Sequence, residues 1–130
     1  MDKKEGIKYC LDIAEYDLET ARAMLEAKRL LYVGFMCHQV IEKALKACYV
    51  SANNEIPPYT HNLIFLAEKA KLDDLFSEEQ RNLIFTLRPL NVESRYPAYK
   101  DELFKTLSYE ICRKMLSDTE EMLKWIKGKL

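Results

Sequence analysis

Apolar residues recur along the first part of the chain at alternating spacings of three and four, the repeat that places side chains on one face of an α-helix. The opposite face of this segment carries Asp, Glu and Lys. The members of the apolar stripe are Ile7, Leu11, Ala14, Leu18, Ala21 and Leu25. The stripe ends before Lys28 and Arg29, so the pattern predicts a helix over about residues 4–27.

A second apolar stripe predicts a helix that begins near Leu30. Its members are Val33, Cys37, Ile41, Ala44, Leu45 and Cys48. This helix is expected to end within residues 51–54, because Asn accepts the left-handed conformation of a C-terminal cap. The prolines that follow, Pro57 and Pro58, cannot continue a helix.

Further apolar residues surround the second helix outside its stripe: Tyr32, Phe35, Met36, Val40 and Tyr49. A helix with apolar residues on several sides is predicted to be covered on several sides. An apolar remainder of this kind is typical of a subunit interface. The sequence therefore predicts a homodimer.

The second half of the chain predicts two short helices and a long one. Thr60 is the expected N-cap of the first, and the Ser77–Gln80 capping box opens the second, which ends at Arg88–Pro89. An ordered loop is expected over residues 88–102 and the last helix over about 104–127. The inward-facing residues of that helix are predicted to be Leu107, Ile111, Met115, Met122 and Ile126.

No stretch of useful length alternates between apolar and polar residues, so no β-strand is expected. The chain has 130 residues, a size typical of one domain. The sequence therefore predicts a single all-α domain over residues 1–130. Its expected architecture is an antiparallel up-and-down bundle of about five helices, three long and two short.

Charge and cysteine content narrow the function further. Twenty basic and twenty-one acidic residues argue against a protein that coats nucleic acid by bulk charge, but they allow a local basic patch. The four cysteines are isolated from one another in sequence and lie among apolar residues, which predicts buried, reduced thiols. The N-terminus lacks the apolar core of a signal peptide, and no apolar run is long enough to span a membrane. We therefore expect a cytoplasmic protein.

The second helix carries a row of polar residues, Gln39, Glu42, Lys43 and Lys46, which we place on its polar side. Lys43 and Lys46 are three residues apart, so their ammonium groups can converge on a phosphate or on an acidic partner. The same row also fits a solvated helix face with Glu–Lys pairs. The sequence leaves both interpretations open.

Three other residues have chemistry suited to a binding or catalytic site. His61 is expected in the first turn of the third helix, where the helix dipole disfavours its charged form. It is a candidate base, or it closes the loop by bonding a backbone carbonyl. Arg95 is suited to binding phosphate and Tyr96 to stacking on a base, although the pair also fits a loop pinned against the bundle.

Other signals are negative or structural. The second histidine, His38, borders the buried stripe and is expected to be a hydrogen-bonded residue between helices. The chain has no glycine-rich phosphate loop, no GxSxG and no HExxH. It also lacks clustered ligands at metal-binding spacing, so neither a metal nor a cofactor is expected.

Four stretches occur in an order that resembles HEPN-domain proteins: AEYDLETARAML, FMCHQVIEKALKA, THNL and SRYP. The resemblance extends over about residues 7–127. It implies a bundle of about five helices that commonly dimerises. Small prokaryotic members often work with a minimal nucleotidyltransferase, commonly as a toxin–antitoxin pair, and many relatives cleave RNA without a metal.

The sequence departs from the nuclease members of that family. Their signature is an Arg followed four to six residues later by His, whereas here Arg29 precedes His38 by nine and no Arg stands at that distance before His61. The resemblance therefore favours a binding module that presents a cleft to a nucleotide, RNA or a nucleotidyltransferase. The alternatives are a metal-independent ribonuclease that uses His61 and Arg95, and a purely structural interaction domain.

Overall fold

The computed structural model describes residues 2–91, 101–102 and 105–130, and all regular structure in these ranges is helical. This confirms the predicted all-α class. The elements in chain order are α1 (Lys3–Glu26), α2 (Leu30–Asn53), α3 (Leu63–Lys69), the 3₁₀ helix η1 (Asp73–Leu75), α4 (Glu78–Leu87), the 3₁₀ helix η2 (Arg88–Leu90) and α6 (Tyr109–Lys127).

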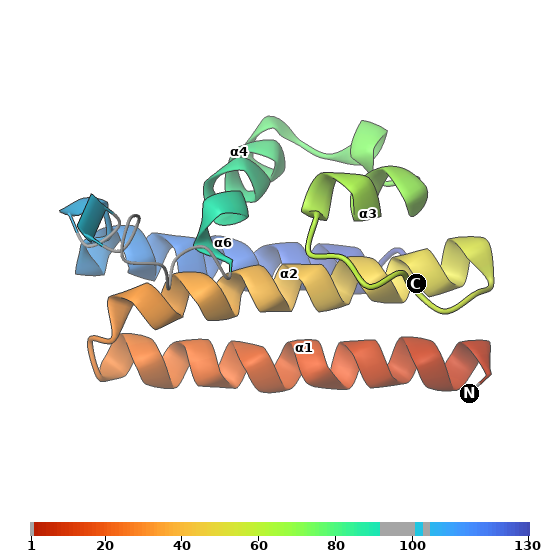
Figure 1. The fold of residues 1–130 in the computed structure, drawn as a ribbon, viewed down its shortest axis with the longest axis horizontal. Helices are drawn as coiled ribbons and strands as arrows, with labels where there is room; N and C mark the ends of the chain where they lie inside the picture. Colours follow the sequence, from red (N-terminus) through yellow and green to blue (C-terminus); the bar gives the residue numbers. More distant parts are fainter. Residues whose placement is uncertain (1, 92–100, 103–104) are drawn as a thin grey trace.

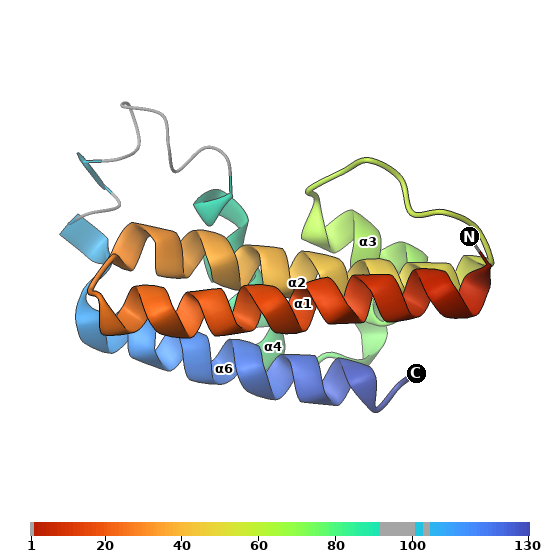
Figure 2. The same ribbon diagram turned by 90° about the horizontal axis from the view of Figure 1, so that it is seen from below.

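Helix α2 lies at the centre of the bundle. It runs antiparallel to α1 along their full length, while α3 and α4 cover another side of it (Figure 1). Helix α6 packs along α2 and α1, and the segment containing α3 and α4 carries the chain back so that α6 runs in the same direction as α2 (Figure 2). Both chain termini therefore lie at the end of the bundle where α2 finishes.

Two predicted helix ends are confirmed by their capping groups. Asn54 caps α2 in the left-handed conformation, with φ of 58°, and its backbone N–H donates to the carbonyl of Val50. At the start of α4, the hydroxyl of Ser77 accepts from the backbone N–H of Gln80, and the Gln80 side chain accepts from the backbone of Ser77. Local hydrogen bonding thus sets both ends, as the sequence indicates.

Two other predicted starts are wrong. Helix α3 begins at Leu63 with Asn62 as its N-cap, while the Thr60 hydroxyl instead accepts from the backbone N–H of Asn62. Residues 105–106 are helical, but the chain is not helical at residues 107–108, so α6 begins at Tyr109, where the Ser108 hydroxyl caps it. At each helix start, the side chain of the residue directly before the helix, Asn62 or Ser108, accepts a hydrogen bond from a free backbone N–H group of the first turn.

One side chain on the predicted inward face of α6 is exposed in the structure. Ile111, predicted to be buried, is 48% exposed, while Leu107 is buried in the segment that precedes the helix. The buried stripe of α6 consists of Cys112, Met115, Leu116, Thr119, Met122, Leu123 and Ile126. This stripe follows a regular helical repeat, and Ile111 lies just outside it.

The apolar residues around α2 that suggested a homodimer are covered mainly within the chain. Val40 and Tyr49 are buried and Phe35 and Met36 are partly buried, whereas Tyr32 remains 40% exposed. The covering is supplied by α1, α3, α4 and α6 together. The prediction that α2 is covered on several sides is confirmed, but a second subunit is not required to explain it.

The segment after α4 packs tightly on α2. A Cβ atom added to Gly34 would lie 2.9 Å from Cδ1 of Leu90, so glycine allows η2 to approach the helix closely. The loop predicted over residues 88–102 thus begins with a 3₁₀ turn, and Arg95 and Tyr96 lie outside the described residues.

All four cysteines are free and buried, as predicted.

Candidate functional site

The side chain of Glu42 is fully buried, contrary to its predicted place on the polar side of α2. Its carboxylate oxygen Oε1 lies 2.8 Å from Nδ1 of His61. The other oxygen, Oε2, accepts from the ammonium groups of Lys46 at 3.1 Å and Lys43 at 3.3 Å. Three side chains from two segments of the chain therefore converge on one buried carboxylate.

The carboxylate remains charged despite its burial. Removal from water raises the pKa of Glu42, but the hydrogen bonds from His61 and Lys46, together with the positive charges of Lys46 and Lys43, lower it by more. The net result is a pKa below the usual value for Glu. A buried carboxylate with donors on both oxygens is the arrangement in which an ionised acid is tolerated in a protein interior.

His61 lies in the connection before α3, one residue before the N-cap Asn62, and not in the first turn of the helix as predicted. Its Nδ1 bonds the Glu42 side chain rather than a backbone carbonyl. Because an ionised carboxylate can only accept, Nδ1 of His61 is the donor in this bond. In the neutral imidazole the second nitrogen, Nε2, then carries a lone pair and acts as an acceptor.

His38 lies beneath this pair and is buried. Its Nδ1 is 3.7 Å from Oε1 of Glu42, too long for a hydrogen bond, and has no hydrogen-bond partner among the described residues. The His38 ring also interacts with the backbone of His61 through a hydrogen bond. The prediction that His38 is a hydrogen-bonded residue is therefore confirmed only in part. Burial lowers the pKa of His38 from 6.5 to about 4, outweighing the nearby charge of Glu42.

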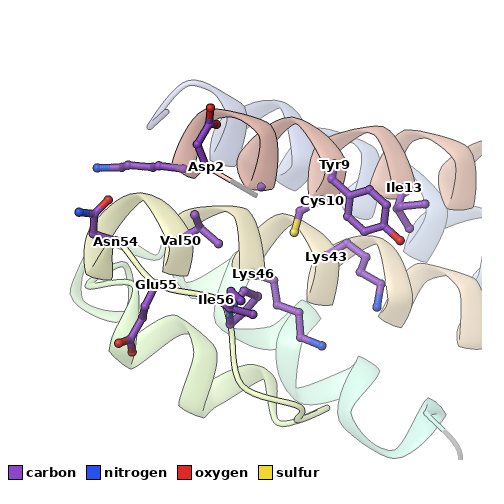
Figure 3. Close-up of a pocket in the computed structure, with 13 residues that line it drawn as sticks. Asp2, Tyr9, Cys10, Ile13, Lys43, Lys46, Val50, Asn54, Glu55 and Ile56 are labelled. Atoms are coloured by element: carbon purple, nitrogen blue, oxygen red, sulfur yellow. The ribbon is translucent and has the colours of Figure 1, made fainter.

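Lys43 and Lys46 keep part of their side chains accessible, with exposed fractions of 27% and 12%. They extend from α2 on the same side, next to a groove between α1, α2 and the segment that follows α2 (Figure 3). The groove has a volume of about 520 Å³. Besides the two lysines, it is lined by Asp2, Lys3, Gly6, Tyr9, Cys10, Ile13, Val50, Asn54, Glu55, Ile56 and Pro57.

The local charges nearly cancel. Asp17 on α1 interacts electrostatically with both Lys43 and Glu42, and burial raises its pKa above the usual value. Two lysines thus face two carboxylates, Asp17 and Glu42, with His61 and His38 as further titratable side chains of the cluster. Because Glu42 is fully buried while the two lysine side chains are 27% and 12% exposed, part of the positive charge of Lys43 and Lys46 remains accessible.

The structure brings together only part of the predicted site. Glu42, Lys43, Lys46 and His61 form one cluster. Gln39 is half-buried one turn earlier on α2 and does not line the groove. The remaining predicted residues fall outside the described part of the chain.

Sequence reasoning missed the contribution of α1, which supplies Tyr9, Cys10 and Asp17. No motif marks these positions, because they become neighbours of the lysines only when α1 and α2 pair. The burial of Glu42 did have a signal. Glu42 is four residues after His38 and adjoins Ile41, so it falls within the buried stripe of α2.

Two negative findings apply to the described ranges. Within them, no group of three or more His, Cys, Asp or Glu residues is arranged to hold a metal ion. In the same ranges, no helix has the length and apolar character needed to span a membrane.

The comparison with protein families identifies the domain. The family model described as "HEPN domain" matches residues 7–129, nearly the whole chain. The chain belongs to the HEPN-domain family. The match extends from α1 to the end of α6, so the buried carboxylate and both groove lysines are part of the HEPN domain. Membership relates the protein to nucleotide- and RNA-related modules. Searches among curated proteins and solved structures give no significant match.

We predict that acid destabilises this HEPN domain through His38. The unfolded chain takes up a proton on His38 near pH 6.5, whereas the folded protein does so only near pH 4. Between pH 7.5 and pH 5 the free energy of unfolding should fall by about 2 kcal/mol from this residue. Glu42 contributes little in this window, because its pKa lies below the usual value for Glu.

Urea titrations at the two pH values test this. The His38→Gln variant should lose most of the pH dependence, since Gln does not titrate. An equal pH dependence in the variant and the original protein would show that His38 is not the residue responsible.

Proposed function

We propose that this HEPN domain is a binding module for a nucleotide or a short RNA, with the phosphate held at Lys43 and Lys46. The observation that carries this proposal is the position of two ammonium groups at one groove, each already oriented by the buried Glu42 carboxylate. Each ammonium group has three N–H donors and uses one on Glu42, so donors remain for phosphate oxygens. His61, Arg95 and Tyr96 are further proposed members of the cleft.

The rest of the groove suits the non-phosphate part of such a ligand. Ile13, Val50 and Ile56 provide apolar surface, and Tyr9 provides an aromatic ring on which a base can stack. The volume of about 520 Å³ falls within the usual range for small-molecule sites, roughly 300–1,000 Å³. At the far end of the groove, Asp2, Asn54 and Glu55 carry oxygen atoms that can accept hydrogen bonds from amino or hydroxyl groups of a ligand.

The proposal includes partners. Family membership supports a homodimer and a minimal nucleotidyltransferase as a second protein, acting together in a system of the toxin–antitoxin type. Exposed apolar side chains outside the groove, such as Tyr16 on α1 and Phe85 on α4, provide surface for either contact.

We predict that Lys43→Ala and Lys46→Ala each weaken the binding of ATP or oligouridylate by roughly five- to tenfold at low salt. Each variant leaves Glu42 with His61 and one lysine, so the fold is retained. Each should also reduce the dependence of log affinity on log salt by about one, as expected for one lost phosphate contact. Isothermal titration calorimetry at several salt concentrations measures both quantities.

Lys114→Ala is the matched control, since Lys114 pairs with Asp118 on the exposed side of α6 and should leave affinity unchanged. Arg95→Ala tests the part of the cleft outside the described residues. If the unmodified protein binds neither ligand at low salt, and a partner protein still co-purifies with it, the purely structural interaction domain is the better interpretation.

One observation favours a second candidate function, a metal-independent ribonuclease. The buried Glu42 orients His61 with an acceptor nitrogen free, which is the form in which an imidazole acts as a general base. Arg95 would then stabilise the charge that develops on the phosphate. The Arg–His spacing of the family's nucleases is absent from this sequence, so such an enzyme would use a site of its own.

For that second function, we predict cleavage of RNA in EDTA by the unmodified protein and no cleavage by His61→Ala. The assay compares the two proteins purified in parallel on one RNA substrate. Equal background cleavage by both proteins would rule out the ribonuclease and leave the binding module as the proposed function.

We predict a dimer in solution at micromolar concentrations, measured by light scattering coupled to gel filtration. The expected mass is twice the 15.3 kDa of the chain. A single sharp monomer mass would remove the homodimer from the proposal without affecting the groove.

A further inference from the structure

A second concave surface lies along the line where α4 packs against α6 (Figure 2). It consists of two pockets of about 310 and 240 Å³, and because Glu79, Leu83 and Asp118 line both, the pockets form one continuous furrow. We propose that this α4–α6 furrow is the docking site for a basic amphipathic helix of a partner protein. None of its residues lines the groove at Lys43 and Lys46, so the inference goes beyond the proposed function.

The end of the furrow at Trp125 is acidic. Glu79 on α4 and Glu121 on α6 are exposed there, and neither carboxylate forms an ion pair with another described residue. Asp118 is half-buried between them and the other end, and it pairs with Lys114 at 2.6 Å. The furrow is therefore lined by three carboxylates and one ammonium group, which gives it a net negative charge.

The indole ring of Trp125 makes this acidic end suited to a cation. The ring already attracts one positive charge of its own chain, because the ammonium group of Lys129 lies 4.8 Å from the ring centroid. Contact with Phe76, at 5.7 Å between ring centroids, holds the indole in place. A guanidinium stacks on an indole and bonds carboxylates through its fork of N–H donors, whereas an ammonium group does neither as well. Arginine is therefore the side chain that this end fits best.

The opposite end of the furrow is apolar. Ile111 at the start of α6 is 48% exposed and lines this end. Met115 and Leu83, both buried, lie beside it in the same pocket. An apolar side chain that covers Ile111 removes apolar surface of both partners from water, which favours association.

The spacing of the two ends fits a helix. Met115 lies at the apolar end and Met122 at the acidic end, so the ends are two turns of α6 apart, about 10 Å. A helix lying along the furrow reaches both ends with side chains seven positions apart on one face. An acidic helix would bring like charges together, and a purely apolar one would cover the carboxylates without a partner. The charges thus select a helix that carries an apolar residue and, two turns away, an arginine.

The test adds three synthetic helical peptides of about 18 residues, all without tryptophan, to the intact protein at low salt. The first peptide carries two Leu and, two turns along the same face, two Arg; the second has Glu in place of Arg, and the third has Ser in place of Leu. Trp125 is the only tryptophan of the chain, so its emission reports binding at the furrow. The first peptide should change this emission saturably, the second should not, and the third should bind at least about tenfold more weakly than the first.

Variants at exposed positions assign the binding to the furrow, with affinities taken from the anisotropy of labelled peptides. Glu121→Lys reverses a charge at the acidic end, so it should weaken the Leu–Arg peptide at least about tenfold and strengthen the Leu–Glu peptide. Glu68→Lys makes the same change on α3 outside the furrow, and this matched control should alter neither affinity. Ile111→Ser should weaken the Leu–Arg peptide but not the Ser–Arg peptide.

Several results would overturn the docking of a basic helix. They are a Kd above about 1 mM for the Leu–Arg peptide, equal binding of the Leu–Arg and Leu–Glu peptides, and undiminished binding to Glu121→Lys. If spermine changes the Trp125 emission as the peptide does, and Leu adds nothing over Ser, the furrow is instead a site for small cations. If Ile111→Ser turns a dimer into a monomer, the occupant is a second copy of this chain. Oligouridylate binding at the groove is measured separately, so failure at either surface leaves the other proposal standing.

Discussion

The burial of one charge, on Glu42, sets the requirements for the rest of the site. A carboxylate removed from water is stable in its ionised form only when donors surround it. In this HEPN domain the donors come from the same helix, through Lys43 and Lys46, and from the connection to α3, through His61. The residues with accessible polar groups are thus the ones that stabilise the buried charge, so the proposed binding and the stability depend on the same contacts.

That dependence also explains the central position of α2. A helix that carries both apolar residues on several sides and a buried ionised group needs neighbours all around it. Helices α1 and α6 cover its apolar sides, and the segment leading to α3 covers Glu42. The close approach of Leu90 to Gly34 completes the covering near the start of α2. The fold is therefore organised around one helix rather than around a symmetric core.

The sequence was informative where structure is determined locally. Helical repeats located α1 and α2, and the Ser77–Gln80 capping box located the start of α4, because these signals depend on residues within one or two turns of each other. It was misleading where a nearby side chain competed, as at Asn62 and Ser108. Sequence reasoning identifies much of the cluster but places Glu42 on the wrong side of α2. Its pairing with His61 depends on how a connection folds back, which no local pattern records.

All the residues that line the groove lie between Asp2 and Pro57, within the helical hairpin of α1 and α2 and the turn after it. The groove forms where the start of α1 meets the end of α2, so its geometry depends on the pairing of these two helices. The part of the protein from α4 onward supports the hairpin without contributing to the groove wall. Side chains on the outer surfaces of α4 and α6 can therefore be exchanged without replacing any residue of the groove wall.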